Sequence, residues 1–255
     1  MSQIVRYPQL VFALGFLVLW ISAQVGAFFR KRRGNPEIAE REDFGVVVSA
    51  SLTLLALIIG FSFSMASSRY DARKTLEASE ANAVATEYAR ADFLPPTDAE
   101  TVRTLLRNYL EQRVLFYETR DSRQLQRIGV DTVQLENELW TAVQGPAAAE
   151  TTPVIALAVS GMNEVLSSRG YAQAAWLNRI PITAWVLMTA IAVCCNVLIG
   201  YGARRGEAKA GLLLVLPLIV SISFSLIANI DSPRGGLVRV YPQNLVSLSH
   251  SLHPH

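Results

Sequence analysis

Four long apolar runs constrain this chain of 255 residues more than any other feature of its sequence. Each run is free of Asp, Glu, Lys and Arg until its ends, and each is close to the roughly 20 residues that a helix needs to cross a bilayer. Apolar residues make up 51% of the chain and charged residues only 17%, unlike an ordinary soluble domain. The sequence therefore predicts an all-α membrane protein with four transmembrane helices, at 8–29, 44–66, 182–200 and 211–230.

The first run could instead be a secretory signal peptide. Its apolar core is longer than the usual hydrophobic region of such a peptide, and no small-residue cleavage site follows it. It ends in the basic cluster Arg30-Lys31-Arg32-Arg33, which is typical of a segment that stops transfer across the membrane. These features favour a retained helix.

Residues 67–181 separate the second and third runs and carry fifteen acidic and twelve basic side chains. Helical periodicity without strand alternation predicts an extramembrane helical domain here. No helix breaker occurs between 44 and Pro95-Pro96, so one helix is predicted over 44–93, with a length of about 75 Å. Such a helix would form a stalk. The predicted domains are 1–66 (transmembrane helices 1 and 2), 67–181 (helical domain with stalk), 182–230 (transmembrane helices 3 and 4) and 231–255 (C-terminal tail).

Capping signals predict the helix boundaries within 67–181. Helix starts are predicted at Thr97, in a Thr-x-x-Glu capping box, at Asp131, and at Thr152 before a proline. Helix ends are predicted at Gly145-Pro146 and at Gly170.

The second run carries small residues, several of them with hydroxyl groups, at spacings of three or four, so they share about a quarter of the helix surface. Such a face can line water beside an ion path, because hydroxyls replace part of an ion's hydration shell. It can equally pack against another helix. Leu57 and Phe61 border this face and predict a hydrophobic constriction, although both could instead face lipid. The small residues are Gly45, Ser49, Thr53, Ala56, Gly60 and Ser64, and the predicted pore-lining residues are Ser49, Thr53, Leu57, Gly60, Phe61 and Ser64.

A second polar stripe, Ser221, Ser225 and Asn229, repeats at near-helical spacing in the fourth run. Two polar stripes suggest a bundle with a wet or hydrogen-bonded interior, to which each subunit of an oligomer would contribute. Charged residues near the membrane edge could act at a pore mouth, or they could pair or meet water. These candidate mouth charges are Arg69, Asp71, Glu77, Glu80, Asp231 and Arg234.

Several segments carry a resemblance to a known family. Gly60-Phe61 followed by Arg69-Tyr70 resembles the second membrane helix of bestrophin anion channels, which has Gly-Phe and then Arg with an aromatic residue at this spacing. Over 44–245 the chain is similar to the bacterial bestrophin-like domain family, through Gly60-Phe61 to Asp71, Glu80-Ala81-Asn82-Ala83, Leu105-Leu106-Arg107-Asn108-Tyr109, Arg179-Ile180-Pro181 and the segment 231–240. The resemblance implies a channel, with Thr53, Leu57 and Phe61 at the hydrophobic neck of bestrophins. Thr53 departs from the bulky apolar residue of that neck, and the acidic calcium clasp of animal bestrophins has no counterpart.

We therefore expect an oligomeric bestrophin-like channel that conducts small inorganic ions passively through a bacterial plasma membrane. The alternative is a non-conducting sensor or adaptor whose helical domain binds a partner. Bestrophin kinship favours anions, whereas Asp71, Glu77 and Glu80 would concentrate cations. The expected partners are membrane lipid, small ions and further copies of the chain.

Other classes of function have little support in the sequence. A net charge of +2 is too small to indicate a nucleic-acid partner. No enzyme is expected, because the histidines lie in the last six residues and Cys194-Cys195 lie in an apolar run. No cofactor or metal is expected.

The basic residues give two opposing indications of orientation. The segments 30–43 and 204–209 hold five and three basic residues, which favours a cytoplasmic position for both and places the helical domain and the termini in the periplasm. Basic residues also flank the other membrane face. The bestrophin resemblance implies the reverse, a cytoplasmic domain and cytoplasmic termini.

Overall fold

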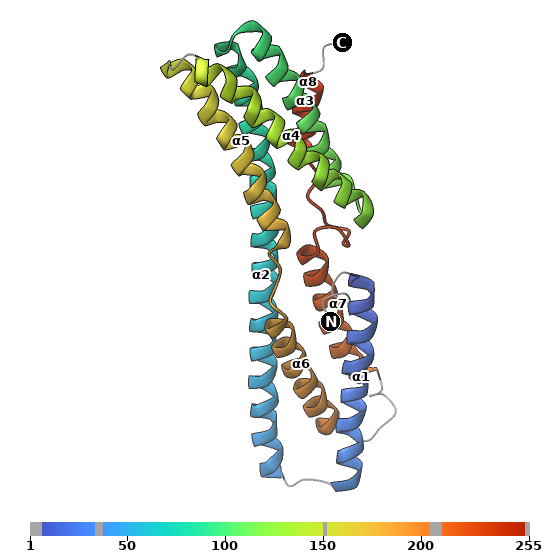
Figure 1. Cartoon of the computed structure of the whole chain (residues 1–255). Coiled ribbons are helices and arrows are strands. Elements are labelled where there is room, and N and C mark those ends of the chain that lie inside the picture. Colours follow the sequence, from blue (N-terminus) through green and yellow to red (C-terminus); the bar gives the residue numbers. More distant parts are fainter. Residues whose placement is uncertain (1–6, 34–37, 150–151, 204–210, 253–255) are drawn as a thin grey trace. The chain divides into compact units, whose positions relative to one another are not determined.

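The structure is a computed structural model that describes residues 7–33, 38–149, 152–203 and 211–252. Over these ranges the secondary structure is entirely helical (Figure 1). The helices are α1 (Pro8–Arg33), α2 (Ile38–Arg90), the 3-10 turn η2 (Ala91–Phe93), α3 (Pro96–Glu118), α4 (Ser122–Ala149), α5 (Pro153–Leu177), α6 (Ile182–Gly202), α7 (Leu212–Asp231) and α8 (Gln243–Leu252).

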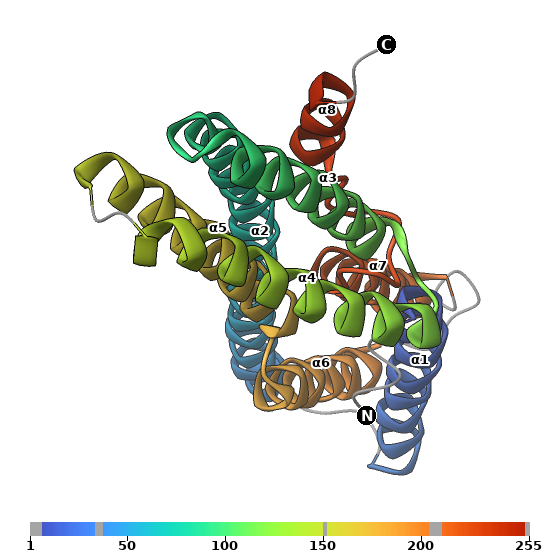
Figure 2. The ribbon, with the colours of Figure 1, turned by 45° about the horizontal axis from the view of Figure 1, so that its top comes forward.

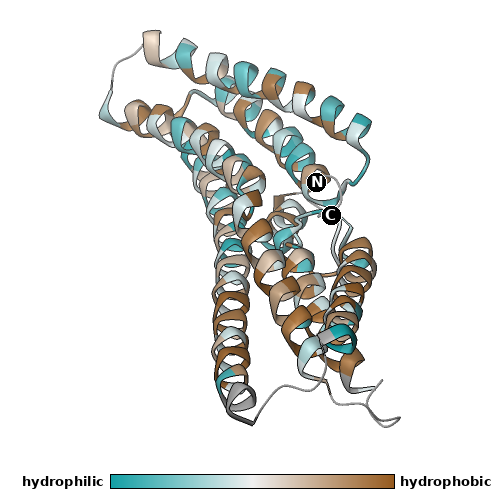
Figure 3. Ribbon diagram, turned by 90° about the horizontal axis from the view of Figure 1, so that it is seen from below, coloured by the Kyte–Doolittle hydropathy of each residue, from teal (hydrophilic) through white to brown (hydrophobic). Residues whose placement is uncertain are grey.

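Within the described residues, four helical stretches are long and apolar enough to cross a membrane, and they contain the four predicted runs except for residues 211 and 212. Hydrophobic residues gather along parts of the helices, and hydrophilic residues are mixed through the rest (Figure 3). The stretches are Pro8–Arg32, Asp43–Phe93, Pro153–Gly202 and Leu213–Asp231. The predicted all-helical class with four apolar spans is therefore confirmed.

The chain divides into two compact units. Unit 1 contains Met1–Tyr70 and Arg179–Arg239, and unit 2 contains Asp71–Asn178 and Val240–His255. Helix α2 contributes to both units as one continuous helix, which bears out the long helix predicted over 44–93. It begins earlier than predicted, at Ile38, and ends earlier, at Arg90, where the turn η2 and then the prolines at 95 and 96 follow.

Unit 1 has an apolar core in which α1 packs against α6 and α7. The core contains Leu19, Leu55, Trp185, Met188 and Phe224, all at most 6% exposed. Two glycines bring α1 and α6 close together. A Cβ on Gly26 would overlap the carbonyl oxygen of Val197, and one on Gly200 would overlap that of Ala23. The two helices therefore contact each other through their backbones, as small residues allow in membranes.

We expect Gly200→Ala to lower the melting temperature of the detergent-solubilised protein by about 5 °C or more, because the added methyl group must push the α1 backbone away. The matched control is Gly60→Ala on α2, where a Cβ meets no described atom within 4 Å. Equal melting temperatures for the two variants would contradict the backbone contact between α1 and α6.

Of the helix starts predicted in unit 2, one is confirmed and another is wrong. Thr152 caps α5, because its Oγ1 accepts a hydrogen bond of 3.2 Å from the backbone N–H of Ile155. The capping box at Thr97 is wrong. Helix α3 begins at Pro96 without a side-chain cap, and Glu100 instead accepts a hydrogen bond from Arg107. The proline is itself suited to the first turn, since it has no N–H that needs a partner.

The other predicted boundaries in unit 2 are also wrong, because packing outweighs local signals. Helix α4 starts at Ser122 rather than Asp131, and it continues through Pro146 to Ala149. Helix α5 continues through Gly170 to Leu177. Ala172 and Trp176, beyond the glycine, are buried, and their burial offsets the roughly 1 kcal/mol by which glycine weakens a helix.

Candidate functional site on helix α2

One side of α2 is open within unit 1. Only 6% of its most apolar stretch is buried, against 22% in α1 and 33% in α7. Leu55 and Ala66 lie in the core of unit 1 and define the buried side. The opposite side therefore presents its side chains outward from unit 1.

All six predicted pore-lining residues lie on this open side. Leu57 is 50% exposed and Phe61 is 66% exposed. In the part of the chain that the structure describes, no atom lies within 4 Å of a Cβ placed on Gly45 or Gly60. The small residues at these positions do not serve to pack α2 against another described helix of the same subunit. The exposed members of the set are Ser49, Thr53, Leu57, Gly60, Phe61 and Ser64.

The hydroxyl of Thr53 is engaged with its own helix. Its Oγ1 donates to the carbonyl oxygen of Ser49, at 2.9 Å. The hydroxyl proton is thereby used, while the oxygen lone pairs remain able to accept a hydrogen bond. Thr53 therefore offers an acceptor and a methyl group on the open side of α2.

The second polar stripe has a different environment, because its residues make contacts inside unit 1. Ser221 is fully buried opposite Gly15 of α1. Ser225 donates to the carbonyl oxygen of Pro8 at 3.0 Å. The Oδ1 atom of Asn229 accepts from the backbone N–H groups of two residues that follow α7. Ser225 and Asn229 thus join α7 to α1 and to the segment after α7 by hydrogen bonds, whereas the buried Oγ of Ser221 has no hydrogen-bond partner among the described residues.

Two of the candidate mouth charges are buried in unit 2. Both oxygens of Glu77 accept hydrogen bonds at the start of α8, from the backbone N–H groups of Asn244 (2.9 Å) and Leu245 (3.0 Å) and from Nδ2 of Asn244. Glu77 therefore caps α8 from a distant part of the chain. Glu80 is fully buried and pairs with Arg113. Both charges are used for packing α2 against other parts of unit 2.

Asp231 links three parts of unit 1, namely the end of α7, the residues just before α6 and the middle of α2. Its side chain is 1% exposed, accepts from the backbone N–H of Ile180 at 3.1 Å, and lies 3.7 Å from Arg69. Asp231 is thus ion-paired with Arg69 at the end of the apolar span of α7. Arg234 is half-buried, and Asp71 is exposed.

Comparisons with known proteins decide the family. The model of the Bestrophin-like domain matches residues 13–245. The chain belongs to this family. The resemblance drawn from Gly60-Phe61 and the other segments is therefore confirmed, and the family together with the apolar helices makes this a multi-pass membrane protein.

Solved structures share the fold of this family member at low sequence identity. Two are variants of a bacterial bestrophin homologue from Klebsiella pneumoniae. The first is 14% identical with a TM-score of 0.61, covering 96% of this chain and 97% of the other. The second is 12% identical with a TM-score of 0.64, covering 96% and 98%. A third, a membrane protein, is 13% identical with a TM-score of 0.60, covering 99% and 98%. Comparison with curated protein sequences found no match.

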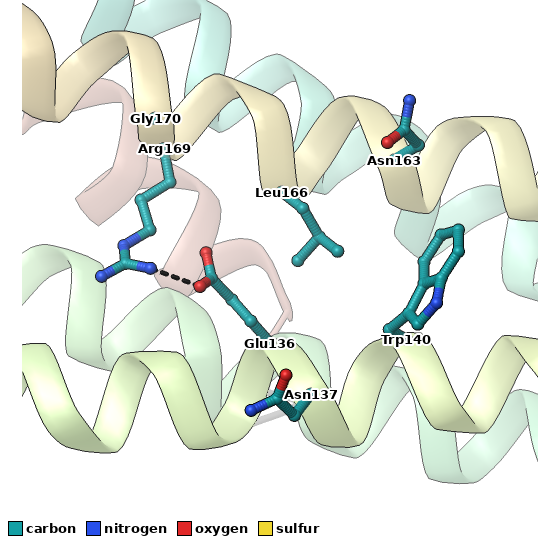
Figure 4. Close-up of a pocket in the computed structure, with 7 residues that line it drawn as sticks. All are labelled: Glu136, Asn137, Trp140, Asn163, Leu166, Arg169 and Gly170. Atoms are coloured by element: carbon teal, nitrogen blue, oxygen red, sulfur yellow. Dashed lines mark hydrogen bonds and ion pairs between the residues drawn. The ribbon is translucent and has the colours of Figure 1, made fainter.

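A cavity of about 400 Å³ lies between α4 and α5 in unit 2 (Figure 4). Glu136 and Trp140 face it from α4, and Leu166 and Arg169 face them from α5. Arg169 donates to Glu136, and partial burial raises the pKa of the Glu136 carboxyl while the guanidinium opposes that rise. An aromatic ring, an aliphatic side chain and an ion pair at one surface suit a small amphipathic molecule.

Glu87 is a buried carboxyl group that the sequence analysis missed. It is fully buried in unit 2, and neither carboxylate oxygen has a hydrogen-bond partner. A Cβ on Gly161 of α5 would overlap Oε2 of Glu87, so the carboxyl lies directly against the α5 backbone. Burial raises the pKa of Glu87 to about 8, with Glu164 adding to the rise and Arg90 opposing it. Its spacing from Ala83, Val84 and Ala91 on one helix face is the sequence signal for this burial.

Proposed function

We propose that this protein is a homo-oligomeric channel through which small inorganic ions pass passively, with the open side of α2 facing a path shared by neighbouring subunits. The observation that carries the proposal is the lack of any described packing partner over Gly45 and Gly60, on a face that also bears Ser49 and Thr53. A row of hydroxyls and glycines facing lipid would gain nothing from its polar groups. Facing water between subunits, the same groups can contact a partly hydrated ion.

Leu57 and Phe61 give this path its proposed constriction. Both are large and apolar, both are at least half exposed, and they lie one turn apart on α2. Copies from several subunits around an axis would form two apolar rings. Such rings resist ion passage because a narrow apolar segment expels water. Membership of the Bestrophin-like domain family supports the same arrangement.

The topology that we propose places the helices between α2 and α6 outside the bilayer. The segment 71–178 contains a fully buried acidic residue, Glu80, paired with Arg113, and mixed charges on its other faces. Only α1, α6, α7 and the apolar part of α2 are then left to cross the membrane. We also propose that the membrane is the bacterial plasma membrane and that the helical domain lies in the periplasm. Labelling of the variant Asp98→Cys in intact cells with a membrane-impermeant thiol reagent tests on which side the helical domain lies. A periplasmic domain should be labelled, whereas the cytoplasmic domain of the bestrophin topology should be protected.

Ion flux through liposomes tests the channel. The purified protein should pass ions, and Phe61→Ala should raise the flux several-fold because it opens the narrower ring. Gly60→Leu should lower it by filling the path. The control is Phe29→Ala on α1, which removes a phenylalanine of similar exposure (55%) away from the proposed path.

Three outcomes would contradict the proposal. These are no flux in any sodium, potassium, chloride or nitrate gradient, an equal rise of flux for Phe61→Ala and Phe29→Ala, or a monomer in detergent. A monomer has no axis around which α2 faces could gather.

The cavity between α4 and α5 supports the second candidate, a non-conducting sensor or adaptor whose helical domain binds a partner. A protein without flux whose melting temperature rises with a small amphipathic compound would favour this candidate. Trp140→Ala should then abolish the rise, since it removes the aromatic wall.

A further inference from the structure

The segment after α7 has a fixed backbone. Oδ1 of Asn229 accepts hydrogen bonds from the backbone N–H groups of Leu237, at 2.6 Å, and Val238, at 3.0 Å. A Cβ on Gly236 would overlap the carbonyl oxygen of Asn229, so only glycine fits there. The residues 232–239, which we call the α7 loop, are thus tied to the last turn of a membrane helix.

Two more contacts stiffen the α7 loop. The backbone N–H of Gly235 donates to Oγ of Ser232 at 3.2 Å, and Nε of Arg239 donates to the carbonyl oxygen of Gly236 at 3.1 Å. These contacts fix the loop backbone and one side of the Arg239 guanidinium.

The loop directs an apolar side chain away from the protein. Leu237 is 87% exposed, and Val238 beside it is 37% exposed. The apolar span of α7 ends at Asp231, so these side chains follow the membrane helix by a few residues. An apolar side chain at this depth gains free energy by entering the boundary between headgroups and acyl chains.

Arginines surround the same edge of unit 1. Asp231 contacts Arg69 and the backbone N–H of Ile180, the residue after Arg179. The α7 loop, which begins directly after Asp231, contains Arg234 and Arg239. Four arginines and one aspartate give three net positive charges, carried by the middle of α2, the residues just before α6, the end of α7 and the loop after it. A basic cluster directly beside membrane helices attracts anionic lipids.

We propose that the α7 loop, with Arg69 and Arg179, binds the headgroups of anionic phospholipids, while Leu237 enters the acyl boundary. Guanidinium groups donate paired hydrogen bonds to phosphate oxygens, and anionic headgroups supply the net charge that zwitterionic ones lack. The loop backbone that carries Leu237, Arg234 and Arg239 is already ordered before binding, so binding costs little further backbone conformational entropy. Lipid binding at this surface does not depend on conduction along the open side of α2.

The test compares lipids retained by the full-length protein in native mass spectra, after equilibration with equal amounts of phosphatidylglycerol and phosphatidylcholine. We expect the protein to retain phosphatidylglycerol preferentially. Arg239→Gln should reduce that preference about five-fold, the effect of one arginine near an anionic surface, and Arg234→Gln with Arg239→Gln should reduce it about 25-fold. Leu237→Ser should lower retention of both lipids and keep the preference.

The control replaces two exposed arginines of unit 2, Arg120→Gln with Arg127→Gln, and should change nothing. Unchanged preference in the single variant Arg239→Gln, whose residue is exposed, would overturn the proposal even if the double variant folds poorly. Equal retention of the two lipids by the native protein would overturn it too. Added inorganic phosphate should leave the bound lipid in place, and displacement would identify a site for soluble anions instead.

Discussion

Arg113→Met is expected to destabilise the protein by about 3–5 kcal/mol, because it leaves the buried carboxylate of Glu80 without its cation. Arg113 is 2% exposed and Glu80 is fully buried. Arg113 donates to Glu80 from Nε and from Nη2, and the Tyr117 hydroxyl donates to the same carboxylate at 3.2 Å. Burial alone would lower the pKa of Arg113, but the charge and hydrogen bond of Glu80, together with Tyr109 and Tyr117, outweigh burial and raise the pKa. Truncation of Arg113 or Glu80 therefore leaves the other as an unpaired buried charge, which lowers the free energy of unfolding.

The measurement is the melting temperature in detergent, followed by tryptophan fluorescence, since Trp176 packs edge-on against Tyr117. We expect a fall of about 10 °C or more for Arg113→Met. A double variant, Arg113→Met with Glu80→Met, should recover much of the loss because no charge remains buried. The control Arg103→Met breaks the surface pair with Asp92 and should cost at most about 1 kcal/mol. Equal losses in Arg113→Met and Arg103→Met would show that the buried pair has no special cost.

Glu87→Gln is expected to remove most of a pH dependence of stability. The pKa of Glu87 is raised to about 8 in the folded protein, whereas the pKa of an unfolded glutamate is 4.5. Between these pH values the unfolded chain releases a proton that the folded protein keeps. The stability that this proton provides is complete below about pH 4.5, and it is lost as the pH rises through about 8.

A series of melting temperatures from pH 5 to pH 9 tests this expectation. The native protein should become less stable as the pH rises, and Glu87→Gln should flatten the curve and exceed the native protein at pH 9, because its amide needs no proton to stay neutral. The control is Glu118→Gln, at an exposed position on α3. A native curve that is level over this range, or one that the exposed variant flattens equally, would contradict a protonated Glu87.

The sequence predicted that the segment 67–181 is helical, but it could not predict which distant residues the buried side chains of this segment contact. Thr152 before Pro153 shows a start signal that needs only neighbouring residues, and it caps α5 as predicted. Gly170 and Pro146 are local stop signals, yet both helices continue: α5 passes Gly170 to the buried Trp176, and α4 passes Pro146, which is itself buried, to Ala149. Arg113 stands within the apolar repeat of α3, a sign of burial, but nothing nearby in the sequence identifies Glu80 as its partner.

The two polar stripes show the same limit for the candidate site. Both have small or hydroxylated residues at helical spacing. Ser225 bonds to Pro8, 217 positions away, whereas the glycines at 45 and 60 on α2 have no described neighbour. Spacing alone therefore could not distinguish the stripe that packs from the stripe that stays open.

The sequence by itself determined the four apolar spans, the long α2 helix and the family, because each depends on residues that are close along the chain. Apolar transfer adds up residue by residue over a span of about 20 positions. Only the tertiary structure decided that Glu77 caps α8, that Asp231 joins Arg69 to the start of α6, and that one side of α2 stays open. Burial and pairing depend on which distant segments meet, and that is settled by the packing of the whole chain.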